Sequence, residues 1–302
     1  FAQIGTMAAR IDPMLFIGAI TINIGTFFIT ATRWWLLLRH TGENVAWRQI
    51  LPSYYLGLFF NNLLPTGVGG DVVRTVHLSR RGFDLKALAA SMIMDRAVGL
   101  FVMVLAATAC AAWISVIPLD DMVRRSALIV FSVCLGAAAL AFSPWTGTLL
   151  KWFTRYVRNT RFRRGALESL MLCYSYRTDP ALLVFAALLS LAAQSLAIFS
   201  YILLGRGIGL DLAPIAYFVV IPMVFMAAML PISLGGLGVR EGALVGLLIL
   251  FGVDRQLAIG LSLLYLFSLW IATLPGAAVL LTHGRASGRA VNAKNAMRRV
   301  NS

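Results

Sequence analysis

The chain has 302 residues, of which 60% are hydrophobic and only 13% are charged, whereas about 25% of the residues in an average soluble domain are charged. This composition excludes an ordinary soluble protein and indicates an integral membrane protein. The formal net charge is +14. In so apolar a chain, the retention of Lys and Arg by cytoplasmic loops explains that charge better than nucleic-acid binding does. The cysteines and histidines are scattered, so the sequence indicates no disulfide, metal ion or cofactor.

Five apolar segments are predicted to cross the membrane. A helix needs about 20 residues to cross about 30 Å of hydrocarbon, and in chain order the segments cover 14–38, 87–114, 127–143, 180–205 and 256–282. The third is short, and we expect its flanks to extend it. Residues 50–63 are also apolar, but as a helix they reach only roughly 21 Å, which is too short to cross.

Two further apolar regions, 50–63 and 213–229, each end at a proline and a pair of glycines. The window 64–74 recurs 166 residues later as 230–240, with leucine, proline, both glycines, valine and arginine at the same places. Proline breaks the helical hydrogen-bond ladder, and glycine permits tight turns. In a membrane protein, two helices broken at corresponding positions point to a transport site between internal repeats. The residues expected to shape the breaks are Pro65, Gly69, Gly70, Pro231, Gly235 and Gly236.

The basic residues predict the topology. Most of them fall in four stretches, and all four lie on the cytoplasmic side if each broken region is a hairpin that returns to its own side. Three crossings then separate the starts of the two repeats, and an odd number inverts the second repeat relative to the first. We therefore predict an all-α integral membrane protein with inverted structural repeats, each with a re-entrant broken-helix hairpin. The four basic stretches are 33–49, 74–86, 144–179 and 283–302.

This topology divides the chain into four parts. They are a first membrane repeat, 1–114, with its hairpin at about 50–74; a connection, 115–179, with one span and a basic interfacial cytoplasmic helix over 147–165; a second membrane repeat, 180–282, with its hairpin at about 213–252; and a basic cytoplasmic tail, 283–302. Because the numbering starts at Phe1 and not at a methionine, we expect a further segment upstream.

Ionisable residues occur inside the membrane segments, where each costs about 2.5–3.5 kcal/mol on insertion scales and therefore needs a reason. One interpretation is that they neutralise one another in pairs. The other is that they bind a substrate, which is favoured for Arg74 and Arg240, because each follows a glycine-rich break and the arginine fork suits phosphate oxygens. The six residues are Asp71, Arg74, Asp95, Arg96, Arg240 and Glu241.

Three more polar residues lie near the first hairpin or the first span. Asn61 and Asn62 precede the first break, where they satisfy freed backbone groups or contact a headgroup. Arg33, with Trp34 and Trp35, lies at the end of the first span. We interpret Arg33, Trp34 and Trp35 as interface residues, with Arg33 extending its guanidinium to the membrane surface.

The run from Tyr55 to Arg74 resembles the signature of the lysylphosphatidylglycerol synthase transmembrane-region family, also called uncharacterised-protein family 0104. The pairs Arg33-Trp34 and Asp95-Arg96 fit the same family, and the stretch 231–242 matches its second signature. The resemblance covers essentially the whole chain. It implies a multi-pass protein of the bacterial inner membrane, related to the flippase half of the multiple peptide resistance factor; the cytoplasmic C terminus is predicted by the basic stretches. It also implies that the six ionisable residues belong to a translocation site.

Our first hypothesis is therefore a lipid translocase that moves a phospholipid or a lipid-linked intermediate between leaflets, with the phosphate-bearing headgroup as its partner. Aminoacyl-transferase activity is not expected, because the large soluble domain of those synthases does not follow the last span. Two alternatives stay open: a membrane enzyme or subunit in lipid or envelope-glycan synthesis with Asp71 or Glu241 as a base, and a small-anion transporter. Whether the chain forms a homo-oligomer or works with envelope-biosynthesis partners also stays open.

Overall fold

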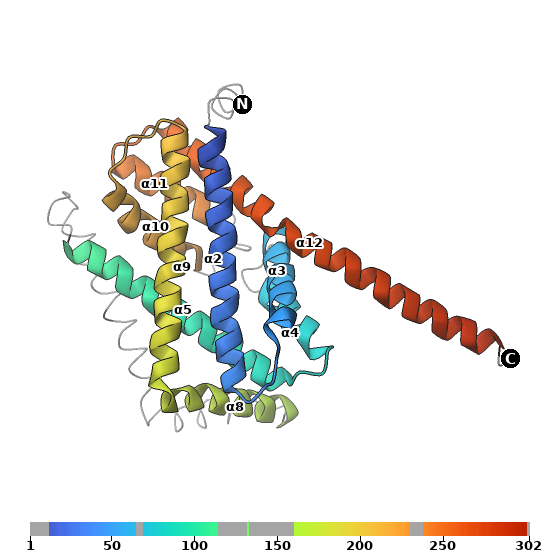
Figure 1. The fold of residues 1–302 in the computed structure, drawn as a ribbon. Helices are drawn as coiled ribbons and strands as arrows, with labels where there is room; N and C mark the ends of the chain where they lie inside the picture. The colour runs from blue at the N-terminus through green and yellow to red at the C-terminus, as the bar shows by residue number, and fades with distance from the viewer. Residues whose placement is uncertain (1–11, 65–68, 114–131, 133–159, 230–237, 301–302) are drawn as a thin grey trace.

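The computed structural model of the chain describes residues 12–64, 69–113, 132, 160–229 and 238–300. The secondary structure within these ranges is helical, as predicted (Figure 1). The first half contains α2 (Pro13–His40), α3 (Trp47–Leu63), α4 (Gly69–Ser79) and α5 (Leu85–Trp113). The second half contains α8 (Thr160–Ser175), the 3-10 turn η1 (Tyr176–Thr178), α9 (Pro180–Gly207), α10 (Pro214–Met229), α11 (Val239–Leu250) and α12 (Arg255–Val300).

Four of these helices are long and apolar enough to cross a membrane, which confirms four of the five predicted spans. They are α2, α9, the part of α5 over 85–106 and the part of α12 over 255–281. The predicted span over 127–143 lies outside the described residues except for residue 132. Of the predicted interfacial helix 147–165, only the end is described, and it forms the start of α8.

The helices α2 and α9, which begin the two predicted repeats, lie side by side and run in opposite directions (Figure 1). The backbone N–H of Asp12 donates to the carbonyl of Gly207 at 3.3 Å, and the Ser200 hydroxyl donates to the carbonyl of Ala19 at 3.4 Å. At the other end of the pair, the Tyr176 hydroxyl donates to the carbonyl of Leu37 at 2.7 Å. An antiparallel pair is the arrangement that inverted repeats require, although the inversion itself stays a prediction.

Both of these helices begin with the same Asp-Pro pair. The Asp12 carboxylate accepts the N–H of Met14 at 2.9 Å, and the Asp179 carboxylate accepts the N–H of Leu182 at 3.0 Å. Each aspartate thereby satisfies a backbone donor that the first turn of a helix leaves without a partner. The proline that follows occupies the first helical position, where its missing N–H removes no hydrogen bond.

Each half of the chain has its own apolar core. One cluster lies in the first half around Trp34, Ile50 and Leu88, and the other lies mostly in the second half around Tyr201, Val220 and Leu248. The long helix α12 connects the two, because Gly276 packs directly on the backbone of α3 at Tyr55. Beyond the predicted span, α12 continues without interruption to Val300 and projects away from the other helices (Figure 1).

The first broken region forms two helices that pack on each other. A Cβ atom added to Gly70 on α4 would overlap the carbonyl oxygen of Gly57 on α3, so the two backbones touch. The N–H of Gly70 also donates to the Asn61 side chain at 2.8 Å. The sequence analysis placed Gly69 and Gly70 in the break, but α4 already includes both glycines. Their missing side chains are what permit this close packing.

Candidate functional site

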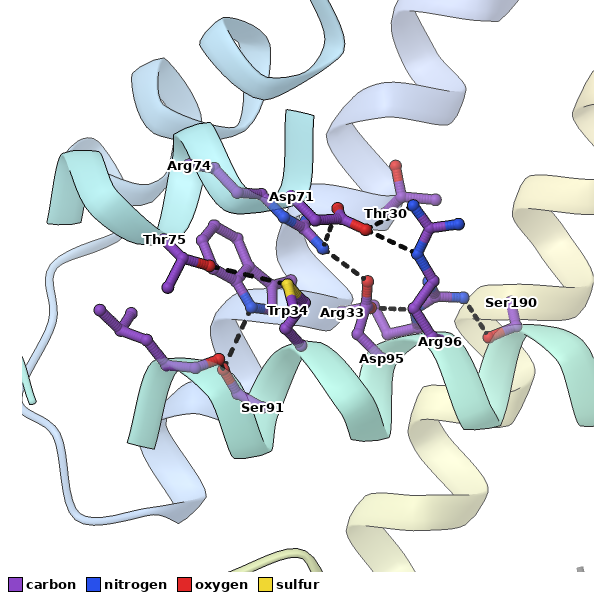
Figure 2. A network of polar contacts seen from close by, with 12 residues as sticks. Thr30, Arg33, Trp34, Asp71, Arg74, Thr75, Ser91, Asp95, Arg96 and Ser190 are labelled. Atoms are coloured by element: carbon purple, nitrogen blue, oxygen red, sulfur yellow. Dashed lines mark hydrogen bonds and ion pairs between the residues drawn. The ribbon is translucent and has the colours of Figure 1, made fainter. Parts of the chain in front are cut away.

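The helices α3 and α4, with α2 and α5, line a cavity of about 280 Å³. Its charged lining consists of three arginines and two aspartates, which Figure 2 shows from close by. Four of the six ionisable residues that the sequence singled out meet here, together with Arg33 and Asn61. The lining is Arg33, Tyr54, Gly57, Leu58, Asn61, Asp71, Arg74, Asp95, Arg96 and Gly99.

Asp95 holds two of the arginines. Its Oδ1 accepts from Nε of Arg33 at 2.7 Å, and its Oδ2 accepts from Nη2 of Arg74 at 3.4 Å. The Asp95 side chain is only 5% exposed. A buried carboxylate is costly unless it is paired, so the two guanidinium groups explain how Asp95 is accommodated within a predicted span.

Asp71 likewise lies between two arginines, Arg74 and Arg96. Its Oδ1 forms an ion pair with Nη2 of Arg74 at 2.9 Å, and its Oδ2 accepts from Nε of Arg96 at 2.8 Å. Asp95 and Arg96 are neighbours in sequence but have different partners, as expected for adjacent residues on a helix. The five charges therefore alternate in sign, in the order Arg33, Asp95, Arg74, Asp71 and Arg96 (Figure 2).

Arg74 lies in the middle of these five charged residues, and two aromatic rings fix its position. Its guanidinium carbon lies 4.2 Å from the ring centre of Trp34 and 5.0 Å from that of Tyr54. Trp34 in turn donates from Nε1 to the hydroxyl of Ser91 at 3.2 Å, which fixes its ring. Cation–π contacts of this kind stabilise a buried guanidinium. Nevertheless, Nε of Arg74 is buried and has no hydrogen-bond partner in the described part of the chain.

Glycines bring the backbone close to the charged groups. A Cβ atom at Gly57 would lie 3.2 Å from Cβ of Arg74, and one at Gly99 would lie 3.3 Å from Nη1 of Arg33. Larger residues at these positions would crowd the arginines. Gly57 and Gly99 were not among the predicted site residues, although Gly57 lies inside the run from Tyr55 to Arg74 that carries the family resemblance.

The interpretation of Arg33 as an interface residue was wrong. Its side chain is 10% exposed and donates to Asp95 and, from Nη1, to the Ser190 hydroxyl on α9 at 2.6 Å. The carboxylate of Asp95 attracts the guanidinium inward, where Ser190 satisfies a further donor. Pairing of this kind could not be predicted from the position of Arg33 at the end of a span.

The two asparagines satisfy other groups of the protein. Asn61 lines the cavity while it accepts the N–H of Gly70, whereas Asn62 donates to the Thr273 hydroxyl on α12 at 2.8 Å. Asn61 thus belongs to the site and also holds α4 against α3. Asn62 does not line the cavity and connects α3 to α12 in the second half of the chain.

Arg240 and Glu241 do not line the cavity. They pair with each other at the start of α11, where Nη2 of Arg240 donates to Oε1 of Glu241 at 2.6 Å. The structure therefore does not bring Arg74 and Arg240 together around one cavity. Four of the residues expected to shape the breaks, Pro65, Pro231, Gly235 and Gly236, lie outside the described residues.

The charges of the cavity favour an anion. Three guanidinium groups face two carboxylates, which leaves one positive charge at pH 7. Within an apolar surrounding, a charge of this kind attracts a counterion much more strongly than it would in water. The unpartnered Nε of Arg74 supplies a donor, and phosphate or carboxylate oxygens are the acceptors that suit arginine.

Comparisons with known proteins agree with the membrane fold. A family model described as the lysylphosphatidylglycerol synthase TM region matches residues 1–276. The chain is 24% identical to a UPF0104 membrane protein of Pyrococcus horikoshii, over 90% of this chain and 88% of the relative. It is 22% identical to each of two UPF0104 membrane proteins of Methanothermobacter thermautotrophicus, over 84% and 90% of this chain and 79% and 86% of the relatives. No solved structure matches the chain.

Proposed function

The chain belongs to the lysylphosphatidylglycerol synthase transmembrane-region family, and from this premise we propose that it is a lipid translocase. It moves a phospholipid or a phosphate-bearing lipid intermediate between the two leaflets of the bacterial inner membrane. The C terminus lies in the cytoplasm, as the basic residues of 283–302 favour. No chemical step on the lipid is part of the proposal.

The observation that carries the proposal is the positively charged cavity around Arg74. Its volume of about 280 Å³ lies just below the range for small-molecule sites, about 300–1,000 Å³. This volume suits a headgroup and not a whole lipid, so the acyl chains would remain in the bilayer. Phosphate oxygens would accept from Nε of Arg74. They would also compete with Asp95 for Nη2 of Arg74, because the Nη2–Oδ2 contact is, at 3.4 Å, the longest ion pair among the five charged residues of the cavity.

Replacement of Arg74 by glutamine tests the proposal without destroying the fold. Asp95 remains paired with Arg33, and Asp71 remains paired with Arg96, so neither carboxylate is left alone. We expect Arg74→Gln to reduce the scrambling of fluorescent phosphatidylglycerol in reconstituted vesicles by at least tenfold, measured by dithionite quenching with and without an imposed pH gradient. A charge-assisted hydrogen bond contributes about 1.5–3 kcal/mol, which corresponds to this factor.

The matched control is Arg206→Gln, which removes an exposed arginine at the end of α9 that does not line the cavity. It should scramble lipid at the wild-type rate. Wild-type rates in Arg74→Gln would contradict the site. A wild-type protein that scrambles no phospholipid under any gradient would contradict the function.

The small cavity also suits a free anion, so a small-anion transporter is the second candidate. Flux of chloride or phosphate measured in the same vesicles separates the two. Anion flux that depends on Arg74 in vesicles that show no lipid scrambling would favour the transporter. The third possibility, an enzyme of lipid or glycan synthesis, requires a product that depends on Asp71 or Glu241.

A further inference from the structure

The contact between α4 and α5 forms one wall of the charged cavity. Asp71 on α4 accepts from Arg96 on α5 (Figure 2). One turn later on α4, the Thr75 hydroxyl contacts the sulfur of Met92 at 3.6 Å, and Met92 lies one turn earlier on α5. The two helices therefore run in opposite directions along this contact. The Asp71 side chain is 6% exposed and that of Arg96 is 46% exposed, so Arg96 lines the cavity and also reaches the outer surface of the protein.

Exposed apolar side chains border Arg96 on the same flank of both helices. In a right-handed helix each residue is rotated by about 100° from the one before it. Because α4 and α5 are antiparallel here, the residue that follows each contacting residue lies on the same flank of the contact in both helices. These positions hold Val72 and Val76 on α4 and Ile93 on α5. Leu100 lies two turns beyond Ile93, and all four of these apolar side chains are exposed.

This flank lies at the depth of the hydrocarbon layer. The part of α5 that is long and apolar enough to cross a membrane covers 85–106, and Arg96 lies near its middle, roughly 16 Å from its start. An arginine exposed at this depth is costly unless a polar group meets it. A phospholipid is the membrane component that offers phosphate oxygens to the guanidinium and acyl chains to the apolar side chains beside it. Its charge also complements the net positive charge of the cavity.

We propose that this flank of α4 and α5 is a lateral entrance through which a phospholipid passes its headgroup from the bilayer into the cavity. The acyl chains stay outside, along Val72 and Val76 on α4 and Ile93 and Leu100 on α5, while Arg96 meets the phosphate at the entrance. The inference rests on the proposed function and deepens it, because it names the route of the substrate. A cavity of about 280 Å³ that opens sideways accepts a headgroup whose chains remain in lipid, whereas a free anion would enter from water.

A fluorescent label at the entrance tests this inference in the full chain. Val72→Cys and, separately, Ile93→Cys are labelled with bimane in a cysteine-free background and reconstituted into phosphatidylglycerol vesicles. The vesicles also contain a phospholipid that carries a nitroxide on its headgroup, and a nitroxide quenches bimane only at short range. The headgroups of the surrounding bilayer lie roughly 15 Å from its centre, so they do not reach these labels. We expect a loss of bimane fluorescence at both positions, because a headgroup enters beside them.

Leu191→Cys on α9 is the control at matched depth. Leu191 is exposed and follows Ser190, which accepts from Arg33. Arg33 in turn pairs with Asp95, the neighbour of Arg96, so the label lies at the same level of the bilayer but away from the entrance. It should keep its fluorescence with the headgroup nitroxide. All three labels should lose fluorescence with a nitroxide placed midway along an acyl chain, which verifies their depth.

Arg96→Gln tests the charge at the entrance, and Asp71 keeps its ion pair with Arg74 in this variant. It should reduce the quenching at Val72→Cys to the level of Leu191→Cys, and Arg96→Lys should restore part of it. Quenching that Arg96→Gln leaves undiminished would overturn the role of the arginine.

The comparison with lipid scrambling separates the entrance from the proposed function. Vesicles that scramble lipid while Val72→Cys and Ile93→Cys are quenched no more than Leu191→Cys overturn the entrance alone. Quenching at the entrance in vesicles that scramble no lipid supports the entrance and contradicts translocation.

Discussion

Arg33 and Asp95 form the shortest contact that joins α2 to α5 in the cavity, at 2.7 Å between Nε and Oδ1. Both side chains are at most 10% exposed. Breaking a buried pair by removing one partner leaves an uncompensated charge and costs about 3–5 kcal/mol. The remaining partner of Asp95, Arg74, lies further away at 3.4 Å and does not replace what is lost.

We therefore expect Arg33→Met to reduce the free energy of unfolding by about 3 kcal/mol, measured by denaturant titration in detergent with tryptophan fluorescence. The double variant Arg33→Met with Asp95→Asn should recover most of this loss, because the buried charge is removed with its partner. Equal losses in the single and double variants would show that the cost comes from packing and not from the stranded carboxylate.

The residues that carry charge could be selected from the sequence, but their partners could not. Asp71, Arg74, Asp95 and Arg96 were selected because ionisable groups are rare in membrane segments, and this reason holds in the structure. The ion pair of Arg33 joins positions 62 residues apart, and that of Arg96 joins positions 25 residues apart. Pairs between residues so far apart in sequence depend on how helices pack, and the period of a single helix does not specify that packing. The contact of Arg74 with Trp34 and that of Arg33 with Ser190 could not be predicted for the same reason.

Among the helices, the close contact between α3 and α4 sets the width of the cavity. Gly57 and Gly70 meet there without side chains, and Asn61 closes the contact through the N–H of Gly70. The proline and glycine pattern predicted two helices with a break between them. It did not predict that Gly69 and Gly70 are helical, because glycine is equally suited to a turn and to close packing of backbones.

Gly70→Ala should separate α3 from α4 and displace Arg74. The added methyl group would overlap the backbone of Gly57, and overpacking of this kind costs about 1–3 kcal/mol. We expect a lower thermal unfolding midpoint together with reduced lipid scrambling.

The control for this change is Gly25→Ala on α2, where a Cβ atom would meet nothing within 4 Å. Alanine favours a helix more than glycine does, so Gly25→Ala should be as stable as the wild type or slightly more stable. Unchanged stability and scrambling in Gly70→Ala would contradict the close contact described for α3 and α4.

For the molecule as a whole, the antiparallel pair of α2 and α9 defines two opposite ends of the protein. His40 stacks on Tyr176 at one end, with ring centres 4.7 Å apart, and Asp12 contacts Gly207 at the other. The positive-inside rule assigns the first end to the cytoplasm. The spans could be predicted from hydropathy alone, but the pairing of α2 with α9 was not predicted, because no local pattern identifies a neighbour so distant in sequence.

Single cysteines in a cysteine-free background should report these two ends. Asn44→Cys and Asp211→Cys replace exposed residues that lie at opposite ends of the antiparallel pair. In intact cells a membrane-impermeant maleimide should label Asp211→Cys and leave Asn44→Cys unlabelled until the cells are opened. Labelling of both from outside, or of Asn44→Cys alone, would contradict the predicted topology.

The contact of α12 with the first hairpin has a consequence for the order of events during synthesis. Asn62 bonds to Thr273, 211 residues later in the chain, and Gly276 covers the backbone of α3 beside it. At a translation rate of about 5–20 residues per second, Thr273 on α12 is synthesised roughly 10–40 s after Asn62 on α3. During that interval the side of α3 around Tyr55 lacks the cover that α12 provides in the folded protein. The packing of α3, which lines the charged cavity, is therefore completed only when α12 has been inserted.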